Sequence, residues 1–287
     1  MVATRQIIEQ TVAAYRLAAE ANLHTAGRIG SVVHLDSRLA DEVMVTADLH
    51  GNRLTFERLA RLADLPAQSR RHLVMQEVCH GGPVYPDTSA CMSHLLLEDV
   101  ANMKVRFGDR FHFILGNHEL AELIDVPIMK SSRMLNLMFR CGMQEMYGRD
   151  ADEVRDAGMH FIRTCPLAVR TASGVFISHS APERVPEDHF DPAILDRSLT
   201  PDDLARFGPV FRMVWGRDFR SENAAAFARA VNASVLVHGH DPCADGYRVP
   251  NEFQVILDSC GSSPSYVIVP SSGSITQKQV IDRIQRV

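Results

Sequence analysis

Short apolar segments recur along the chain, and five of them end directly before residues that commonly bind metals. These segments are rich in Val, Ile, Leu, Met and Phe, which is typical of buried strands. They cover residues 42–46, 72–75, 111–115, 175–177 and 235–237. The residues that follow them are, in order, Asp48 and His50, Glu77, Asn117 to Glu119, His179, and His238 and His240.

Side chains that follow several strands of an open α/β sheet converge in one crevice at the carboxyl ends of those strands. The candidate ligands combine imidazole nitrogens, carboxylates and one amide oxygen. This mixture suits first-row metals such as Mn, Fe and Zn better than a thiolate site or an all-oxygen calcium site. The pattern therefore predicts a metallohydrolase.

Helical spacing of apolar residues marks much of the chain between the predicted strands. Residues 119–163 contain many Met residues and are predicted to form packed helices, and the Pro-rich stretch 182–209 is predicted to be mostly loop. The predicted helices cover residues 2–23, 52–62, 89–107 and 221–231, and the tail after residue 266 is expected to add a strand and a final helix.

Composition narrows the class of protein. The 287 residues carry 35 acidic and 30 basic side chains, for a net charge of −5, and no basic tract, so nucleic acid is not an expected partner. The six cysteines are scattered without a CxxC pair, which favours reduced thiols and a cytoplasmic location. No apolar segment approaches the ~18 residues of a membrane span, and the N-terminus has no apolar signal core.

Four motifs, each after a predicted strand, resemble the successive signatures of the calcineurin-like metallophosphoesterases. They are Asp48-Leu49-His50-Gly51-Asn52, Leu115-Gly116-Asn117-His118-Glu119, Ser178-His179 and Gly239-His240. Within that superfamily the order is most similar to the phosphoprotein phosphatases and the bacterial symmetrical diadenosine tetraphosphatases. The resemblance covers about residues 43 to 262, and it depends on the four motifs in order, because each alone occurs by chance.

The resemblance implies an α/β fold of two facing mixed sheets flanked by helices. Ligands that span positions 48 to 240 favour one domain over residues 1–287, with an N-terminal helical extension (1–30). The segment 119–163 would be a helical insert over the site, or a purely structural packing element.

The resemblance also implies a cofactor and a reaction. Two transition metals, Mn, Fe or Zn, would clamp a phosphate and activate a water for phosphoester hydrolysis. His118 would assist the leaving group, and Glu119 would orient the His118 ring. The implied metal ligands are Asp48, His50, Glu77, Asn117, His179 and His240.

The second motif departs from the family pattern. Glu77 stands where the family has an Asp that bridges both metals, and it either bridges them or supports a single-metal site. His80 replaces a second Asp and is either an extra ligand or a hydrogen-bonding neighbour of His118. Gly81 replaces a phosphate-binding Arg. His238 is a further candidate ligand, because some branches of the family use an HxH pair.

Arg217 and Arg220 are candidates for the missing phosphate contacts, since a guanidinium matches phosphate oxygens in a bidentate manner; surface arginines are the alternative. The expected partner is a phosphorylated substrate, which the fold class leaves open among phosphoprotein, nucleotide and small phosphoester. The sequence does not indicate an oligomeric state.

The altered second motif also motivates a competing hypothesis, a binding or scaffold protein without turnover, although the His118-Glu119 pair argues for an enzyme.

Overall fold

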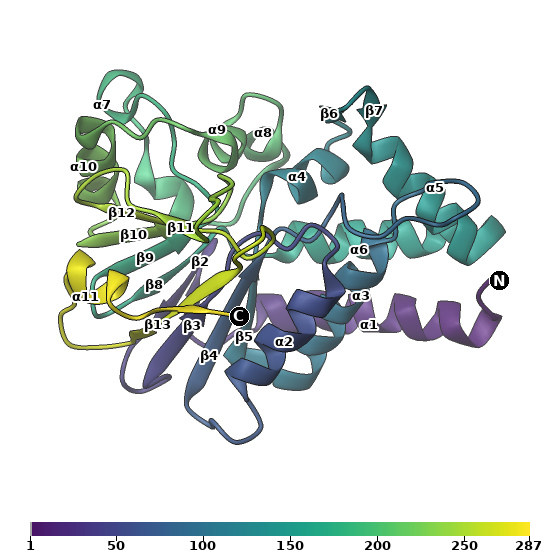
Figure 1. The fold of residues 1–287 in the computed structure, drawn as a ribbon, viewed down its shortest axis with the longest axis horizontal. Helices are drawn as coiled ribbons and strands as arrows, with labels where there is room; N and C mark the ends of the chain where they lie inside the picture. The colour runs from purple at the N-terminus through teal and green to yellow at the C-terminus, as the bar shows by residue number, and fades with distance from the viewer. Residues whose placement is uncertain (1) are drawn as a thin grey trace.

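The computed structural model describes residues 2–287 as two mixed sheets that face each other, with helices outside them (Figure 1). The smaller sheet has the order β14 (Ile284–Arg286), β13 (Ser265–Pro270), β3 (Glu42–Val45), β4 (Arg71–Gln76), β5 (Phe111–Ile114). The larger sheet has the order β1 (Arg28–Ile29), β2 (Val32–Leu35), β8 (Ala168–Thr171), β9 (Val175–Ser178), β10 (Val235–His238), β12 (Gln254–Leu257), β11 (Tyr247–Arg248). The expected fold class is confirmed.

All five predicted strands exist and lie inside these sheets. Strands β3, β4 and β5 are parallel neighbours in the smaller sheet, and β9 and β10 are parallel neighbours in the larger one. Alternate residues of these strands, with Val43, Val74, Val175 and Val235 among them, fill a core between the two sheets. Because each strand contributes to a buried face, the carboxyl ends are held in register at one edge of the sandwich.

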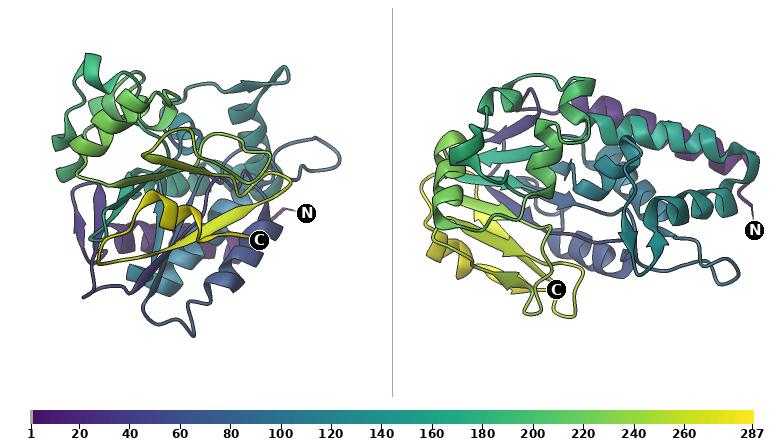
Figure 2. Two further views of the ribbon diagram at one scale, coloured as in Figure 1. Left: turned by 60° about the vertical axis from the view of Figure 1, so that its left-hand side comes forward. Right: turned by 90° about the horizontal axis from the view of Figure 1, so that it is seen from above.

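The chain up to residue 164 supplies most of the longer helices. These are α1 (Arg5–Leu23), α2 (Arg53–Ala63), α3 (Ser93–Phe107), α4 (Asn117–Leu123), α5 (Leu135–Tyr147) and α6 (Ala151–Thr164), with the 3-10 turns η1 (Gly108–Arg110) and η2 (Gly148–Asp150). Helix α1 packs along α6 and α3, as the views of Figure 2 show. Phe111, Phe113 and Met75 point from the smaller sheet into the core under these helices.

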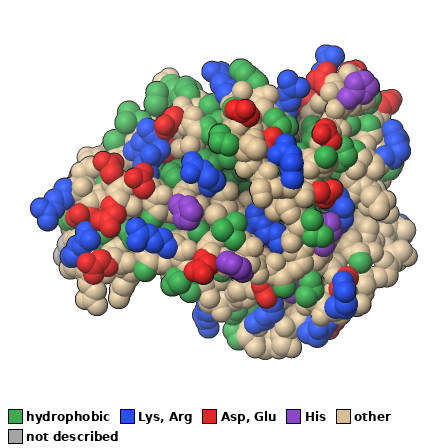
Figure 3. Space-filling view, turned by 180° about the vertical axis from the view of Figure 1, so that it is seen from behind, with side chains coloured by type: hydrophobic (Ala, Val, Ile, Leu, Met, Phe, Trp, Pro, Cys, Tyr) green, Lys and Arg blue, Asp and Glu red, His purple; other side chains and the backbone are tan. Residues whose placement is uncertain are grey.

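The C-terminal half carries shorter helices. They are α7 (Val185–Asp188), η3 (Pro192–Asp196), α8 (Pro201–Leu204), α9 (Pro209–Trp215), α10 (Ser221–Ala230) and α11 (Gln277–Ile281). The expected final helix is thus only α11, and the chain ends on β14. On the face opposite to Figure 1, basic and acidic side chains are interspersed (Figure 3). Within residues 2–287, no helix combines the length and the apolar character needed to cross a membrane.

Two local differences from the expected elements border the site. The helix expected from residue 89 begins at Ser93, because the preceding loop folds back through a bridge between Val84 and Cys91. The segment 119–163 is not entirely helical. It also forms a hairpin of β6 (Met129–Lys130) and β7 (Arg133–Met134), which lies beyond the end of α4 (Figure 1).

Candidate metal centre

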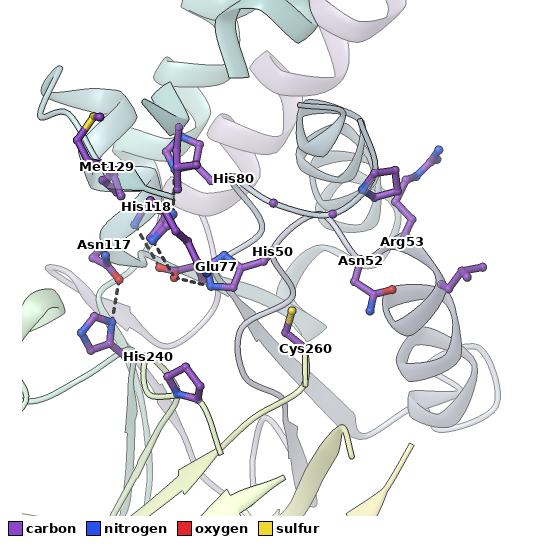
Figure 4. A pocket seen from close by; sticks show the side chains of 18 of the residues that line it. His50, Asn52, Arg53, Glu77, His80, Asn117, His118, Met129, His240 and Cys260 are labelled. Atoms are coloured by element: carbon purple, nitrogen blue, oxygen red, sulfur yellow. Dashed lines mark hydrogen bonds and ion pairs between the residues drawn. The ribbon is translucent and has the colours of Figure 1, made fainter. Parts of the chain in front are cut away.

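The residues that follow β3, β4, β5, β9 and β10 meet at one edge of the sandwich. The structure brings together all six predicted ligands, and five of them are buried, while His50 is partly exposed. Four of them, His50, Glu77, Asn117 and His240, line a cavity of about 650 Å³ (Figure 4). The six residues, called the donor cluster below, are Asp48, His50, Glu77, Asn117, His179 and His240.

One half of the donor cluster gathers around Asn117. Its side-chain oxygen lies 2.8 Å from Nε2 of His179 and 2.8 Å from Nδ1 of His240, and these two nitrogens are 3.1 Å apart. Oε2 of Glu77 lies 3.1 Å from the same His179 nitrogen. Two imidazole nitrogens and two oxygens that point at one another in a buried space form a suitable ligand set for a transition metal.

The other half of the donor cluster gathers around His50. Its Nε2 lies 3.7 Å from Oδ2 of Asp48 and 3.4 Å from Oε1 of Glu77. The two oxygens of Glu77 therefore face different sets of donors, Oε1 toward His50 and Oε2 toward His179. A carboxylate with this placement is suited to touch two metal ions at once.

Unusual backbone geometry aims these side chains. His50, Glu77 and His240 have φ values of 41°, 42° and 68°, in the left-handed region that non-glycine residues rarely adopt. Such strain persists at functional sites because the surrounding fold enforces it. The left-handed geometry also lets the chain turn sharply at the end of each strand, so that the polar residues there face the same crevice.

Two glycines allow the carboxylates to approach the backbone closely. A Cβ on Gly239 would lie 2.4 Å from Oδ1 of Asp48, the oxygen that accepts a hydrogen bond from the backbone N–H of His240. A Cβ on Gly116 would lie 2.5 Å from Oε2 of Glu77. A side chain at either position would therefore displace a carboxylate of the donor cluster.

Gln76 is a site residue that sequence reasoning missed. Its side-chain oxygen accepts a hydrogen bond from Nδ1 of His179 at 2.8 Å, and its amide donates to the backbone oxygen of Thr46 at 2.9 Å. This fixes the His179 ring so that Nε2 faces the donor cluster, a role that the neighbours of metal-binding histidines commonly have. Its position next to Glu77 at the end of a buried strand was the only signal.

Charge is concentrated in this buried space. Burial, with the charge of Glu77, raises the pKa of Asp48 to about 6. Burial also acts to raise the pKa of Glu77, but the charge of His179 and its hydrogen bond to Glu77 outweigh it and hold that pKa well below its usual range. Burial would lower the pKa of His179, yet the carboxylates of Glu77 and Asp48 raise it to about 9. A protonated His179 thus supplies the positive charge that a bound metal would replace.

His118 faces the donor cluster from the start of α4. Its Nε2 lies 3.9 Å from Oε1 of Glu77, and burial lowers the pKa of the ring to about 3, so the ring is neutral.

The expectation that Glu119 contacts and orients the His118 ring is wrong. Oε1 of Glu119 accepts hydrogen bonds from the backbone N–H groups of Val78 and Cys79, because Glu119 points under the β4 loop. His80 takes that place instead, with its Nδ1 at 2.9 Å from Nδ1 of His118.

The less certain candidates separate clearly. Nδ1 of His238 lies 3.2 Å from the hydroxyl of Ser178, whereas Nδ1 of His240 lies against Asn117 and His179, which favours His240 as the ligand of the final motif. Arg217 lines the cavity, whereas Arg220 forms ion pairs with Asp218 and Glu187 and does not line it. The structure therefore does not support the predicted phosphate contact of Arg220, because nearby carboxylates already pair with its guanidinium group.

This arrangement of donors agrees with the comparison to known families. The sequence matches the model of the calcineurin-like phosphoesterases over residues 42–244, a span that includes the whole donor cluster. The chain belongs to the calcineurin-like phosphoesterase family. Members of this family typically use divalent metals, and the chain is accordingly a metallophosphoesterase, an enzyme that hydrolyses phosphoesters.

Solved structures share the fold of this metallophosphoesterase at low sequence identity. A protein serine/threonine phosphatase from Saccharomyces cerevisiae, similar to the human phosphatase PP5, has 14% identity and a TM-score of 0.70, with 98% of this chain and 89% of that chain covered. A cold-active protein-tyrosine phosphatase from a psychrophilic Shewanella species has 15% identity and a TM-score of 0.57, with 87% and 78% covered. Among proteins of curated function, none matches this sequence closely enough to count as a relative.

Proposed function

We propose that this metallophosphoesterase hydrolyses phosphoesters with two metal ions that share the carboxylate of Glu77. The observation that carries this proposal is the placement of the two Glu77 oxygens, which face His50 on one side and His179 on the other. Asp48 and His50 would complete one binding position, and Asn117, His179 and His240 the other. Metal ions bound there would supply the Lewis acidity that activates water and offsets the charge of the phosphate.

His118 would handle the proton of the leaving group. Its Nε2 faces the donor cluster, and the ring lines the cavity with its side chain only 15% exposed. A neutral ring can take up a proton from solvent at Nε2 and give it from the same atom to the leaving oxygen. General acid–base transfer of this kind contributes ~10²–10⁴-fold to turnover.

Lys130 and Arg217 would bind the substrate phosphate. Three basic residues line the cavity, and Arg53 is held by Asp99 through contacts of 2.6 Å and 3.0 Å. Arg217 has a looser contact, 3.4 Å to Asp241. Lys130, on the β6–β7 hairpin, has no carboxylate within 4.0 Å among residues 2–287. The family's phosphate-binding arginine is absent here, because Gly81 occupies its position. The two cationic groups beside the donor cluster would take over its contact with phosphate.

A chelation experiment tests the proposal. Purified protein loaded with Mn, Fe or Zn should hydrolyse an aryl phosphate, lose activity on chelation and regain it when metal is restored. The matched control is the exposed-loop variant Asp87→Asn, which should behave as the wild type. Metal binding without any turnover by the wild type would contradict the proposal and favour the scaffold hypothesis.

A further inference from the structure

A chain of buried hydrogen bonds leads away from the donor cluster behind His118. Nδ1 of His118 lies 2.9 Å from Nδ1 of His80, and Nε2 of His80 lies 2.9 Å from Oε1 of Glu122. The side chains of His80 and Glu122 are both 0% exposed. Figure 4 shows the His80 ring beside that of His118, on the side away from His240.

Two elements build this chain. Glu122 follows His118 by one helical turn on α4, so both side chains lie on one face of the helix. His80 approaches from the loop after β4, and the edge of its ring packs against Phe139, with ring centroids 5.8 Å apart. Both nitrogens of His80 are therefore engaged, which leaves none to bind a metal.

Arginines from the insert hold the far end of the chain. Nε of Arg140 on α5 lies 3.6 Å from Oε2 of Glu122, and Nη2 of Arg155 on α6 lies 4.0 Å from the same oxygen. Both contacts are ion pairs between a guanidinium group and the carboxylate of Glu122. As a carboxylate, Glu122 can only accept hydrogen bonds.

The direction of every proton then follows from Glu122. A carboxylate at Oε1 requires His80 to donate from Nε2. With Nε2 as its donor, His80 presents Nδ1 as the acceptor in its contact with His118, and His118 then donates from its own Nδ1. Neutral His118 is left with a lone pair at Nε2, the atom that faces Glu77 and the cavity.

We propose that His80 and Glu122 are positioning residues that set the tautomer and orientation of His118. This inference rests on the proposed function of His118, and it replaces the role first expected of Glu119. The hydrogen-bond chain presents Nε2 of His118 to the cavity as the atom that takes up a proton from solvent and then gives it to the leaving oxygen. Without the chain, neutral His118 is free to hold its proton on Nε2, where it cannot accept another.

Two substitutions of His80 form a matched test. His80 has a φ of 64°, and both Gly and Asn adopt the left-handed region readily, so neither change should strain the loop. Asn places Oδ1 at nearly the position of the histidine Nδ1 and keeps an acceptor for His118, whereas Gly removes it. We expect His80→Gly to lower kcat by ~10–100-fold with little change in KM, in the range for lost neighbours of a catalytic metal site. His80→Asn should lose clearly less, and added imidazole should partly restore His80→Gly.

Metal content and nuclear magnetic resonance separate this inference from the proposed function. Both variants should hold as much metal as the wild type; loss of metal in His80→Asn would show that His80 is a ligand and overturn the inference. The ¹⁵N shifts of His118 in zinc-loaded protein should show the Nδ1-protonated tautomer in wild type and in His80→Asn, and a mixture in His80→Gly. An Nε2-protonated wild type would also overturn it. This readout needs no turnover, so it stands even if the wild type proves inactive.

Discussion

Glu77 determines the character of the site at the scale of single residues. It is one methylene longer than the aspartate of the family pattern, and its φ of 42° turns it off the end of β4. The longer side chain spans the distance between the His50 and His179 halves of the donor cluster. Because Gly116 has no side chain, the carboxylate of Glu77 can lie directly against its backbone.

Glu77→Gln should therefore cost the protein at least one metal ion and nearly all activity. The change removes the negative charge that offsets two cations and leaves one oxygen acceptor instead of two. Glu77→Asp should keep some metal but lose activity, because its shorter side chain reaches only part of a pocket built around Glu. Elemental analysis of the purified variants measures both effects. Two ions and normal turnover in Glu77→Gln would refute the bridging role.

His118→Asn should leave the metal content intact and reduce turnover by ~10²–10⁴-fold. The reason is that His118 faces the donor cluster without belonging to it, while the adjacent Asn117 is the proposed ligand. Metal analysis alongside steady-state kinetics checks this prediction. If metal is lost together with activity, His118 is a ligand, a role that its grouping with His50 and Glu77 leaves chemically available.

Sequence patterns predicted which residues converge better than what each one contacts. The six donors follow strands, so their meeting at one edge follows from topology alone. The hydrogen-bond partner of His118 could not be predicted from topology. It depends on the left-handed turn at His80 and on the helical turn that brings Glu122 beside His80. Gln76 was missed for a similar reason, since its role requires knowing that His179 lies across the sandwich from it.

At the scale of elements, the strands were predictable and the cover over the site was only partly so. Five strands with continuous apolar character were found correctly, because burial on both faces leaves a clear pattern. The β6–β7 hairpin was not predicted. Its strands have two residues each, too short for any alternation of apolar and polar positions to be visible.

The hairpin gives a prediction for substrate binding. Lys130→Met should raise KM for an aryl phosphate by ~10–100-fold with a smaller effect on kcat, because a hydrogen bond to a charged group is worth about 1.5–3 kcal/mol. Lys278→Met on α11 is the matched control, since Lys278 is exposed and does not line the cavity. An unchanged KM in Lys130→Met would exclude this lysine from the phosphate site.

At the scale of the whole molecule, buried histidines should make stability depend on pH. His72 and His112 pair inside the smaller sheet, Nδ1 to Nε2 at 2.9 Å, on strands β4 and β5. Burial lowers the pKa of His72 to about 4 and holds that of His112 well below its usual range. The unfolded chain therefore binds more protons than the folded protein once the pH falls below about 6.5.

The free energy of unfolding should accordingly fall between about pH 6.5 and pH 4, by up to about 1.4 kcal/mol per pH unit for each histidine. Urea denaturation at several pH values measures this slope, and the double variant His72→Gln/His112→Gln should make it shallower. The exposed variant His24→Gln is the control and should keep the wild-type slope. Equal slopes in all three proteins would show that the buried pair does not titrate on unfolding.

The central claim is a pair of metal ions joined by Glu77, and anomalous X-ray scattering from metal-loaded crystals tests it most directly. We predict two peaks roughly 3.5–4 Å apart. One peak should contact Asp48 and His50, the other should contact Asn117, His179 and His240, and Glu77 should reach both. A single peak, or two peaks of which only one is bound by Glu77, would contradict the account.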